Sequence, residues 1–169
     1  MIPADKCFRD WWGDSAFFYY RPEFYQRAQS GFNIVVAGNA FGCGSSREPA
    51  PKCLIQAGIQ AVIAKSFAFI YARNQVNNGL LGITLEDDDF YELAQEGASV
   101  EIDLSGRKII CAGQTFKFKL DPIEEQLLSA GGLLQIYEKF GPSLFRRLQL
   151  FSVDASKPVA SNGDSKMEW

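Results

Sequence analysis

A glycine- and serine-rich loop is the stretch of the sequence whose residue types are best suited to chemistry. The stretch "FGCGSSREPAP", residues 41 to 51, joins small residues, two hydroxyls and a guanidinium in one run: Gly42, Cys43, Gly44, Ser45, Ser46 and Arg47. Glycine lets main-chain N–H groups approach a ligand closely. Arginine binds carboxylates in bidentate geometry. The loop therefore predicts an anion site in which N–H groups, two hydroxyls and Arg47 converge on a carboxylate.

Two common phosphate-binding motifs do not fit this loop. A P-loop needs a lysine after its last glycine, and Ser45 follows Gly44 here. The glycine spacing of "GNAFGCG" is wrong for a dinucleotide-binding fingerprint, and no acid closes the next strand at the ribose position. A structural alternative stays open, in which the loop is a tight turn whose serines cap a helix and whose Arg47 and Glu48 form a surface ion pair.

The residue types that are missing narrow the chemistry. The chain has no histidine, so it cannot by itself form a Ser-His-Asp or Cys-His nucleophile system. Acid–base chemistry must then use carboxylate, lysine, tyrosine, or an activated serine or cysteine. The four cysteines include no C-x-x-C pair, which argues against a disulfide framework and against a self-contained metal site.

Length and charge favour a single domain that acts on small molecules or proteins. A chain of 169 residues with 47% hydrophobic residues is long enough to bury one core. Its net charge of −3 gives no general attraction to nucleic acid or to anionic membranes. The apolar runs are too short to cross a bilayer and the start "MIPADKCFRD" lacks a signal-peptide core, so we expect a soluble, cytoplasmic protein.

The elements around the loop alternate between strand and helix. We expect irregular, aromatic-rich structure over residues 1–30 with a short helix at 22–28. Buried strands are predicted at 33–38, 60–64 and 82–85, because these runs are short, apolar and β-branched. The helices predicted between them cover 49–58, with Gly58 as C-cap, and 66–78, with Ser66 as N-cap. The loop would then follow the carboxyl end of the first strand of a βαβαβ unit.

The second half of the chain has a different pattern. A capped helix is expected at 88–97 with Gly97 at its end, followed by an antiparallel meander at 99–104, 108–112 and 115–120. Two further helices, 121–132 and 133–141, close a single domain of residues 1–151. The polar segment 152–169 is rich in small residues, and we expect it to be a disordered tail.

Two runs together carry a family resemblance. "GNAFGCGSSREPAP" and "GIQAVIAKSFAFIYARNQVNNGLLGITL" resemble the small, swivelling subunit of 3-isopropylmalate dehydratase and the corresponding C-terminal domain of aconitase. The similarity runs from about residue 32 to 85 and continues more weakly to about 140. It implies an α/β fold of the aconitase swivelling type, a mixed sheet flanked by helices with an antiparallel meander.

The resemblance also implies an activity and a partner. Members of this family are hydro-lyases that move water across a carbon–carbon double bond of a di- or tricarboxylic acid. A 4Fe-4S cluster, held by the large subunit, binds the substrate hydroxyl and a carboxylate, and this chain would hold no cofactor itself. By position, Ser45 would be the catalytic base, and the other substrate-binding residues would be Gly42, Cys43, Gly44, Ser46 and Arg47.

The chain departs from the family pattern in three places. Pro49 stands where the family usually has histidine, and the family's opening strand is reduced to "MIP". Residues 5–30, which should help to read the substrate's side group, are unusually aromatic. Two function classes therefore remain: the small subunit of a hydro-lyase, or a stand-alone relative without the cluster that uses the same carboxylate pocket for another reaction on, or for binding of, a small acid.

Overall fold

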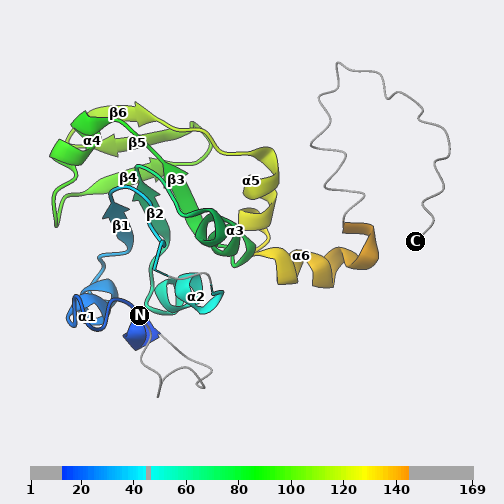
Figure 1. Ribbon diagram of the computed structural model, residues 1–169. Coiled ribbons are helices and arrows are strands. Elements are labelled where there is room, and N and C mark those ends of the chain that lie inside the picture. Colours follow the sequence, from blue (N-terminus) through cyan, green and yellow to red (C-terminus); the bar gives the residue numbers. More distant parts are fainter. Residues whose placement is uncertain (1–12, 45–46, 145–169) are drawn as a thin grey trace.

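A computed structural model of the chain describes residues 13–44 and 47–144 (Figure 1). Several of the sequence-based expectations fall on residues 1–12, 45–46 and 145–169, and these lie outside the described ranges. They concern the shortened opening strand, the hydroxyls of Ser45 and Ser46, and the C-terminal tail. No helix in the described part of the chain is both long and apolar enough to cross a membrane.

A three-stranded parallel sheet forms the centre of the fold (Figure 1). Its strands lie in the order β1-β2-β3 and cover the predicted runs: β1 (Ile34–Ala37), β2 (Ala61–Ala64) and β3 (Leu81–Thr84). Every residue of the central strand β2 is buried, as expected of a strand covered on both faces. The crossover helices are α2 (Pro49–Gln56) and α3 (Phe69–Asn77).

Successive residues of β2 point into two different hydrophobic cores, because side chains alternate along a strand. Val62 belongs to a cluster with Leu54 and Cys53 of α2 and Tyr71 of α3. Ile63 belongs to the second cluster, on the other face, which includes residues of the meander. The site loop and the two crossover helices therefore share the first core.

The predicted meander forms a second, antiparallel sheet. Its strands are β4 (Val100–Asp103), β5 (Lys108–Cys111) and β6 (Gln114–Lys117). The helix before it, α4 (Asp88–Leu93), is capped by the Asp87 carboxylate, which accepts a hydrogen bond from the Asp89 N–H. The α/β fold is confirmed, with its parallel and antiparallel strands in two sheets rather than in one mixed sheet.

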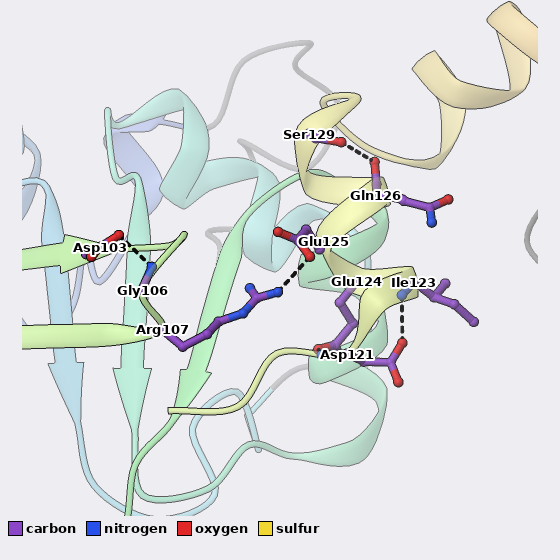
Figure 2. Close-up of polar contacts among 9 residues, drawn as sticks. All are labelled: Asp103, Gly106, Arg107, Asp121, Ile123, Glu124, Glu125, Gln126 and Ser129. Carbon is purple, nitrogen blue, oxygen red and sulfur yellow. Dashed lines mark hydrogen bonds and ion pairs between the residues drawn. The ribbon is translucent and has the colours of Figure 1, made fainter. Parts of the chain in front are cut away.

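The C-terminal helices are tied to the meander by an ion pair. Helix α5 (Pro122–Ser129) begins with a capping box formed by Asp121 and Glu124. Figure 2 shows Arg107, in the turn just before β5, reaching across to Glu125 of α5. The distance between Nη2 and Oε2 is 2.6 Å. Helix α6 (Leu133–Phe140) and a short 3₁₀ turn (Gly141–Ser143) end the described chain.

The aromatic N-terminal segment packs on the first core and forms ion pairs with one carboxylate. It contains a 3₁₀ turn (Gly13–Ser15) and helix α1 (Phe24–Gln29). Glu96 Oε1 lies 2.9 Å from Nη1 of Arg21 and 2.8 Å from Nη1 of Arg27. The hydrogen bond from Arg21 and the charges of both arginines lower the pKa of Glu96. These ion pairs link the aromatic segment to the turn that follows α4.

Several predicted helix boundaries differ from the structure, and two of the differences have an identifiable cause. Helix α3 begins at Phe69, and its N-cap is Ala68 in an extended conformation, so Ser66 is not the cap. The reason is that Phe67 still forms a parallel β-bridge with Phe41. Helix α4 ends at Leu93 rather than near Gly97, because the chain turns tightly there, with the Gln95 N–H donating to the Leu93 carbonyl.

Candidate carboxylate-binding site

The site loop is fastened to the start of the second crossover by main-chain hydrogen bonds. The Phe41 N–H donates to the carbonyl of Ser66 at 2.9 Å, and the Ala68 N–H donates to the carbonyl of Phe41 at 2.9 Å. Phe41 and Phe67 form the parallel bridge beyond the carboxyl ends of β1 and β2. This edge of a parallel sheet is where α/β proteins place ligands.

A side chain adds a further attachment one residue earlier. Ser66 Oγ accepts a hydrogen bond from the Ala40 N–H at 2.8 Å. Ala40 has a φ of 54°, a left-handed conformation that costs energy for a residue with a Cβ. The Ser66 hydroxyl therefore stabilises a turn that the loop sequence alone does not favour.

Gly42 holds the next part of the loop against a buried ring. Its φ is 85°, and a Cβ atom there would lie 2.1 Å from Cγ of Tyr71. Glycine is required at this position both for its conformation and for the close approach. The Tyr71 ring also packs edge-on against Phe41, with 5.2 Å between centroids. The loop is thus fixed at Ala40, Phe41 and Gly42 before it reaches its polar residues.

The polar end of the loop lies at the surface. Cys43, Gly44 and Arg47 are all exposed. The carboxylate of Glu48 forms an ion pair with Lys52 one helical turn later, at 2.8 Å. Helix α2 begins directly afterwards with proline at its first position, which suits a helix N-terminus because proline has no N–H to leave unpaired.

A pocket of about 780 Å³ lies beside this loop. Its walls come from the aromatic segment 15–20, from loop residues 39–44 with Arg47, from α2, and from Tyr71. Arg47 is the one charged side chain among the described residues that line it. An arginine on an otherwise uncharged pocket favours an anionic ligand.

Two titratable side chains in the pocket wall are held in their neutral form. Tyr71 is 2% exposed, and burial raises the pKa of its phenol. Burial also raises the pKa of the Cys53 thiol to about 11, and this thiol donates to the carbonyl of Ala50 at 3.0 Å. A thiol with so high a pKa is a poor nucleophile at neutral pH. Neither side chain is poised as a nucleophile.

The structure brings four of the predicted site residues to one pocket: Gly42, Cys43, Gly44 and Arg47. Ser45 and Ser46 lie outside the described residues. Sequence reasoning missed the contributions of Ser66 and Tyr71 to the site. Both belong to the "SFAFIYARNQVNN" run, which carries part of the family resemblance. Their roles depend on contacts with loop residues that lie 26 and 29 positions earlier in the chain.

A cofactor would have no obvious ligands in the described part of the chain. Residues 13–44 and 47–144 contain no group of three or more histidine, cysteine, aspartate or glutamate side chains that could hold a metal ion. Cys43, Cys53 and Cys111 are free thiols, and two of them are buried. The described residues therefore do not fit an iron–sulfur cluster of their own.

Comparison with known proteins places this fold and loop in a family. The structure is an α/β domain with a glycine-rich loop at the carboxyl edge of a parallel sheet. Residues 14–88 match the family model of the aconitase C-terminal domain. A solved structure of 3-isopropylmalate dehydratase (leuD) from Methanocaldococcus jannaschii shares the fold, with a TM-score of 0.66 and 31% identity over 89% of this chain and 86% of that one.

Relatives of two sizes match the chain. The 3-isopropylmalate dehydratase small subunit of Wolinella succinogenes is 44% identical over 118 residues, 68% of each protein. A 3-isopropylmalate dehydratase large subunit of Glarea lozoyensis is 50% identical over 136 residues, and an aconitase of Alternaria alternata is 45% identical over 171. These two matches include 80% and 99% of this chain, but the chain spans only 16% and 20% of the length of the two fungal proteins.

The chain belongs to the family of aconitase C-terminal domains and 3-isopropylmalate dehydratase small subunits.

Proposed function

We propose that this chain is the swivelling domain of a 3-isopropylmalate dehydratase-like hydro-lyase, which dehydrates or rehydrates a small di- or tricarboxylic acid. The supporting observation is the loop itself. It is fastened by Ser66 and Tyr71, lines a pocket with a single charged side chain, and presents Arg47 at that pocket. Family membership supplies the reaction class, since two of the matching relatives are named as dehydratase subunits.

The loop residues would divide the work between binding and proton transfer. Arg47, with the hydroxyl of Ser46 and loop N–H groups, would hold a substrate carboxylate through charge-assisted hydrogen bonds. Ser45 would accept the proton from the carbon next to a carboxylate. The hydroxyl on the neighbouring carbon would depart as water with a second proton, which an acid on the cluster-bearing partner would have to supply. An ordinary serine hydroxyl is a poor base, so its anion must be stabilised by nearby N–H groups and by a cation. The glycines and Arg47 are suited to supply both.

The iron–sulfur cluster would belong to another polypeptide or to another part of a longer one. The cluster is the group that binds substrate oxygen in this family, and the described residues offer it no ligand set. The matching relatives include small subunits and much longer proteins, so either arrangement is compatible with their lengths. In either arrangement, the cluster-bearing partner would face the loop at residues 42–47.

Reconstitution with a cluster-bearing subunit tests this proposal. The purified chain is mixed with the iron-loaded large subunit of a bacterial two-subunit 3-isopropylmalate dehydratase. Formation of the unsaturated acid is then followed by its ultraviolet absorbance, with 3-isopropylmalate as the first substrate. We expect turnover only when both proteins and iron are present. If the mixed proteins form a complex but turn over none of a panel of alkyl- and arylalkylmalates, the hydro-lyase assignment is wrong.

Three variants separate the proposed roles within that assay. Arg47→Lys should lower kcat/KM, by an amount that corresponds to a loss of about 2 to 4 kcal/mol of transition-state stabilisation. The reason is that an ammonium cannot reproduce the planar, bidentate contact of a guanidinium with a carboxylate. Ser45→Ala should lower kcat while binding of the substrate persists. Arg73→Lys is the matched control, because Arg73 is exposed on α3, where its guanidinium lies 4.5 Å from the centre of the Phe69 ring and outside the pocket.

A further inference from the structure

A second groove, of about 480 Å³, lies on the opposite side of α2 from the site pocket. Pro49 and Cys53 of α2 line the site pocket, whereas Glu48 and Lys52 line the groove, as the helical spacing of these positions requires. The other walls of the groove come from the end of α3, from α6 and from Leu144. The two cavities share no lining residue among the described ones, so the groove is separate from the candidate carboxylate site.

The apolar part of the groove wall is exposed to solvent along α6. Its members are Leu133, Leu134, Tyr137 and Leu144. Leu134 is 64% exposed and Tyr137 is 46% exposed, and their spacing of three residues places them on one side of the helix. Large apolar side chains that are exposed together mark a surface on which another apolar group can be buried.

The polar part of the wall suits a peptide segment. It includes four side-chain amides: Asn74, Asn77, Asn78 and Gln135. An amide side chain can both donate hydrogen bonds to main-chain groups and accept them. The charged side chains among the described lining residues are Glu48 and Lys52, which pair with each other at 2.8 Å. The groove therefore favours an uncharged, apolar side of a peptide over a charged small molecule.

The described chain ends at this groove. Leu144 is 1% exposed, lines the groove, and belongs to the third hydrophobic core together with Leu127 and Ile136. The Cα atom of the next residue, Phe145, is about 3.8 Å from that of Leu144, the spacing of any trans peptide. The segment that follows Leu144 therefore needs no linker to reach the groove.

That segment has a sequence suited to the groove. Residues 145–151 read "FRRLQLF", and the apolar positions Phe145, Leu148 and Phe151 recur every three residues. This spacing places the three side chains on one side of a helix, with Arg146 and Leu150 on the opposite side. Amphipathic helical segments dock in apolar grooves through anchors spaced in this way. From position 152 the sequence is mainly polar, so the run of apolar anchors ends at Phe151.

We propose that residues 145–151 occupy this groove, with Phe145, Leu148 and Phe151 packed against Leu134 and Tyr137 of α6. The segment covers the exposed apolar side of α6 and contacts the first turn of α2. Helix α2, which begins directly after the site loop, is then enclosed on the side away from the site pocket. This inference does not depend on the hydro-lyase assignment or on the carboxylate site.

Nuclear Overhauser effects in the full, isotopically labelled chain test the inference directly. We expect cross-peaks between the side chains of Leu134 or Tyr137 and those of at least one of the three proposed anchors. Their relative intensities should be the same at low and high protein concentration. Leu148→Asp should remove these cross-peaks, because it places a charge against an apolar wall. Leu150→Asp is the matched control on the opposite side of the segment and should keep them.

Urea unfolding of the same two variants gives a second measurement. The equilibrium constant for unfolding should rise about ten- to a hundredfold in Leu148→Asp, the effect of uncovering one buried leucine side chain, and should stay near the wild-type value in Leu150→Asp. Absence of the cross-peaks in the wild type, or equal unfolding of the two variants, would overturn the inference. Cross-peaks between labelled and unlabelled molecules in a mixed sample would place a second copy in the groove, and they would overturn it as well.

Discussion

The backbone of Gly42 lies directly against the ring of Tyr71, so closely that a Cβ atom on Gly42 would be 2.1 Å from Tyr71 Cγ. One residue of the candidate site is thereby fixed to a core residue of α3, 29 positions later in the chain. This contact joins the hydrophobic core to the loop that carries Arg47. A substitution at Gly42 is therefore expected to affect both the stability of the domain and the position of the loop.

Gly42→Ala should destabilise the domain by about 2 to 4 kcal/mol. The added methyl group clashes with the Tyr71 ring, and the φ of 85° is unfavourable for alanine. Urea unfolding followed by circular dichroism measures the loss. Gly44→Ala is the matched control, because a Cβ atom there meets nothing within 4 Å. Equal stabilities of the two variants would contradict the packing described for Gly42.

Ser66→Ala should weaken binding of malonate, a small dicarboxylate, at the loop while the fold is retained. The variant deletes the acceptor for the Ala40 N–H, which holds the left-handed turn, at a cost of about 1 kcal/mol. Ser66→Thr keeps the hydroxyl and should largely restore binding. Ser129→Ala, which removes an exposed bond to the Gln126 carbonyl on α5, should have no effect on it. Malonate affinity that is unchanged in Ser66→Ala would show that this bond does not position the loop.

Stability should fall as the pH rises through the titration of Cys53. The pKa of this thiol is raised from 9.0 to about 11 by burial, so the folded state keeps a proton that the unfolded state releases. The contribution of the protonated Cys53 thiol to stability is therefore fully present below about pH 9. It is lost progressively up to about pH 11, and the free energy of unfolding falls by an amount on the order of 2 kcal/mol.

The Cys53→Ala variant should reduce this pH dependence, most clearly between pH 8 and 10, whatever its effect on stability at neutral pH. Above about pH 10 the phenols of Tyr71 and Tyr91, whose pKa values burial also raises, add an alkaline loss that the variant keeps. Urea unfolding at several pH values between 8 and 11 gives the slopes. The exposed thiol of Cys43 provides the control, and Cys43→Ala should keep the wild-type slope. If Cys53→Ala and the wild type lose stability in parallel, another group is responsible for the alkaline loss.

The central strands were predictable because their signal is local. "NIVVAG" and "QAVIA" are short apolar runs that each contain a strand of the parallel sheet, and "GITL" overlaps the third strand, which begins one residue earlier at Leu81. The same holds for the meander, whose alternation of apolar and polar residues follows the two faces of one sheet. The loop was predictable for a similar reason, since its glycines and arginine are adjacent in sequence.

The start of α3 and the pocket were not predictable, because both depend on residues far apart in the chain. Ser66 has the side chain of a helix cap, but the bridge between Phe41 and Phe67 keeps the backbone extended for two more residues. The pocket joins the aromatic segment 15–20 to the loop, to α2 and to Tyr71. No pattern within any of these segments shows that they meet at one cavity.

The most direct test of the carboxylate site is a titration of the isotopically labelled chain with malonate, followed by heteronuclear NMR. We expect chemical-shift changes to cluster at residues 41–48 and to saturate. Arg47→Lys should weaken the binding strongly, and Arg73→Lys should leave it unchanged. Shifts that cluster elsewhere in the chain, or equal affinities of the wild type and Arg47→Lys, would contradict the assignment of this loop as the carboxylate-binding site.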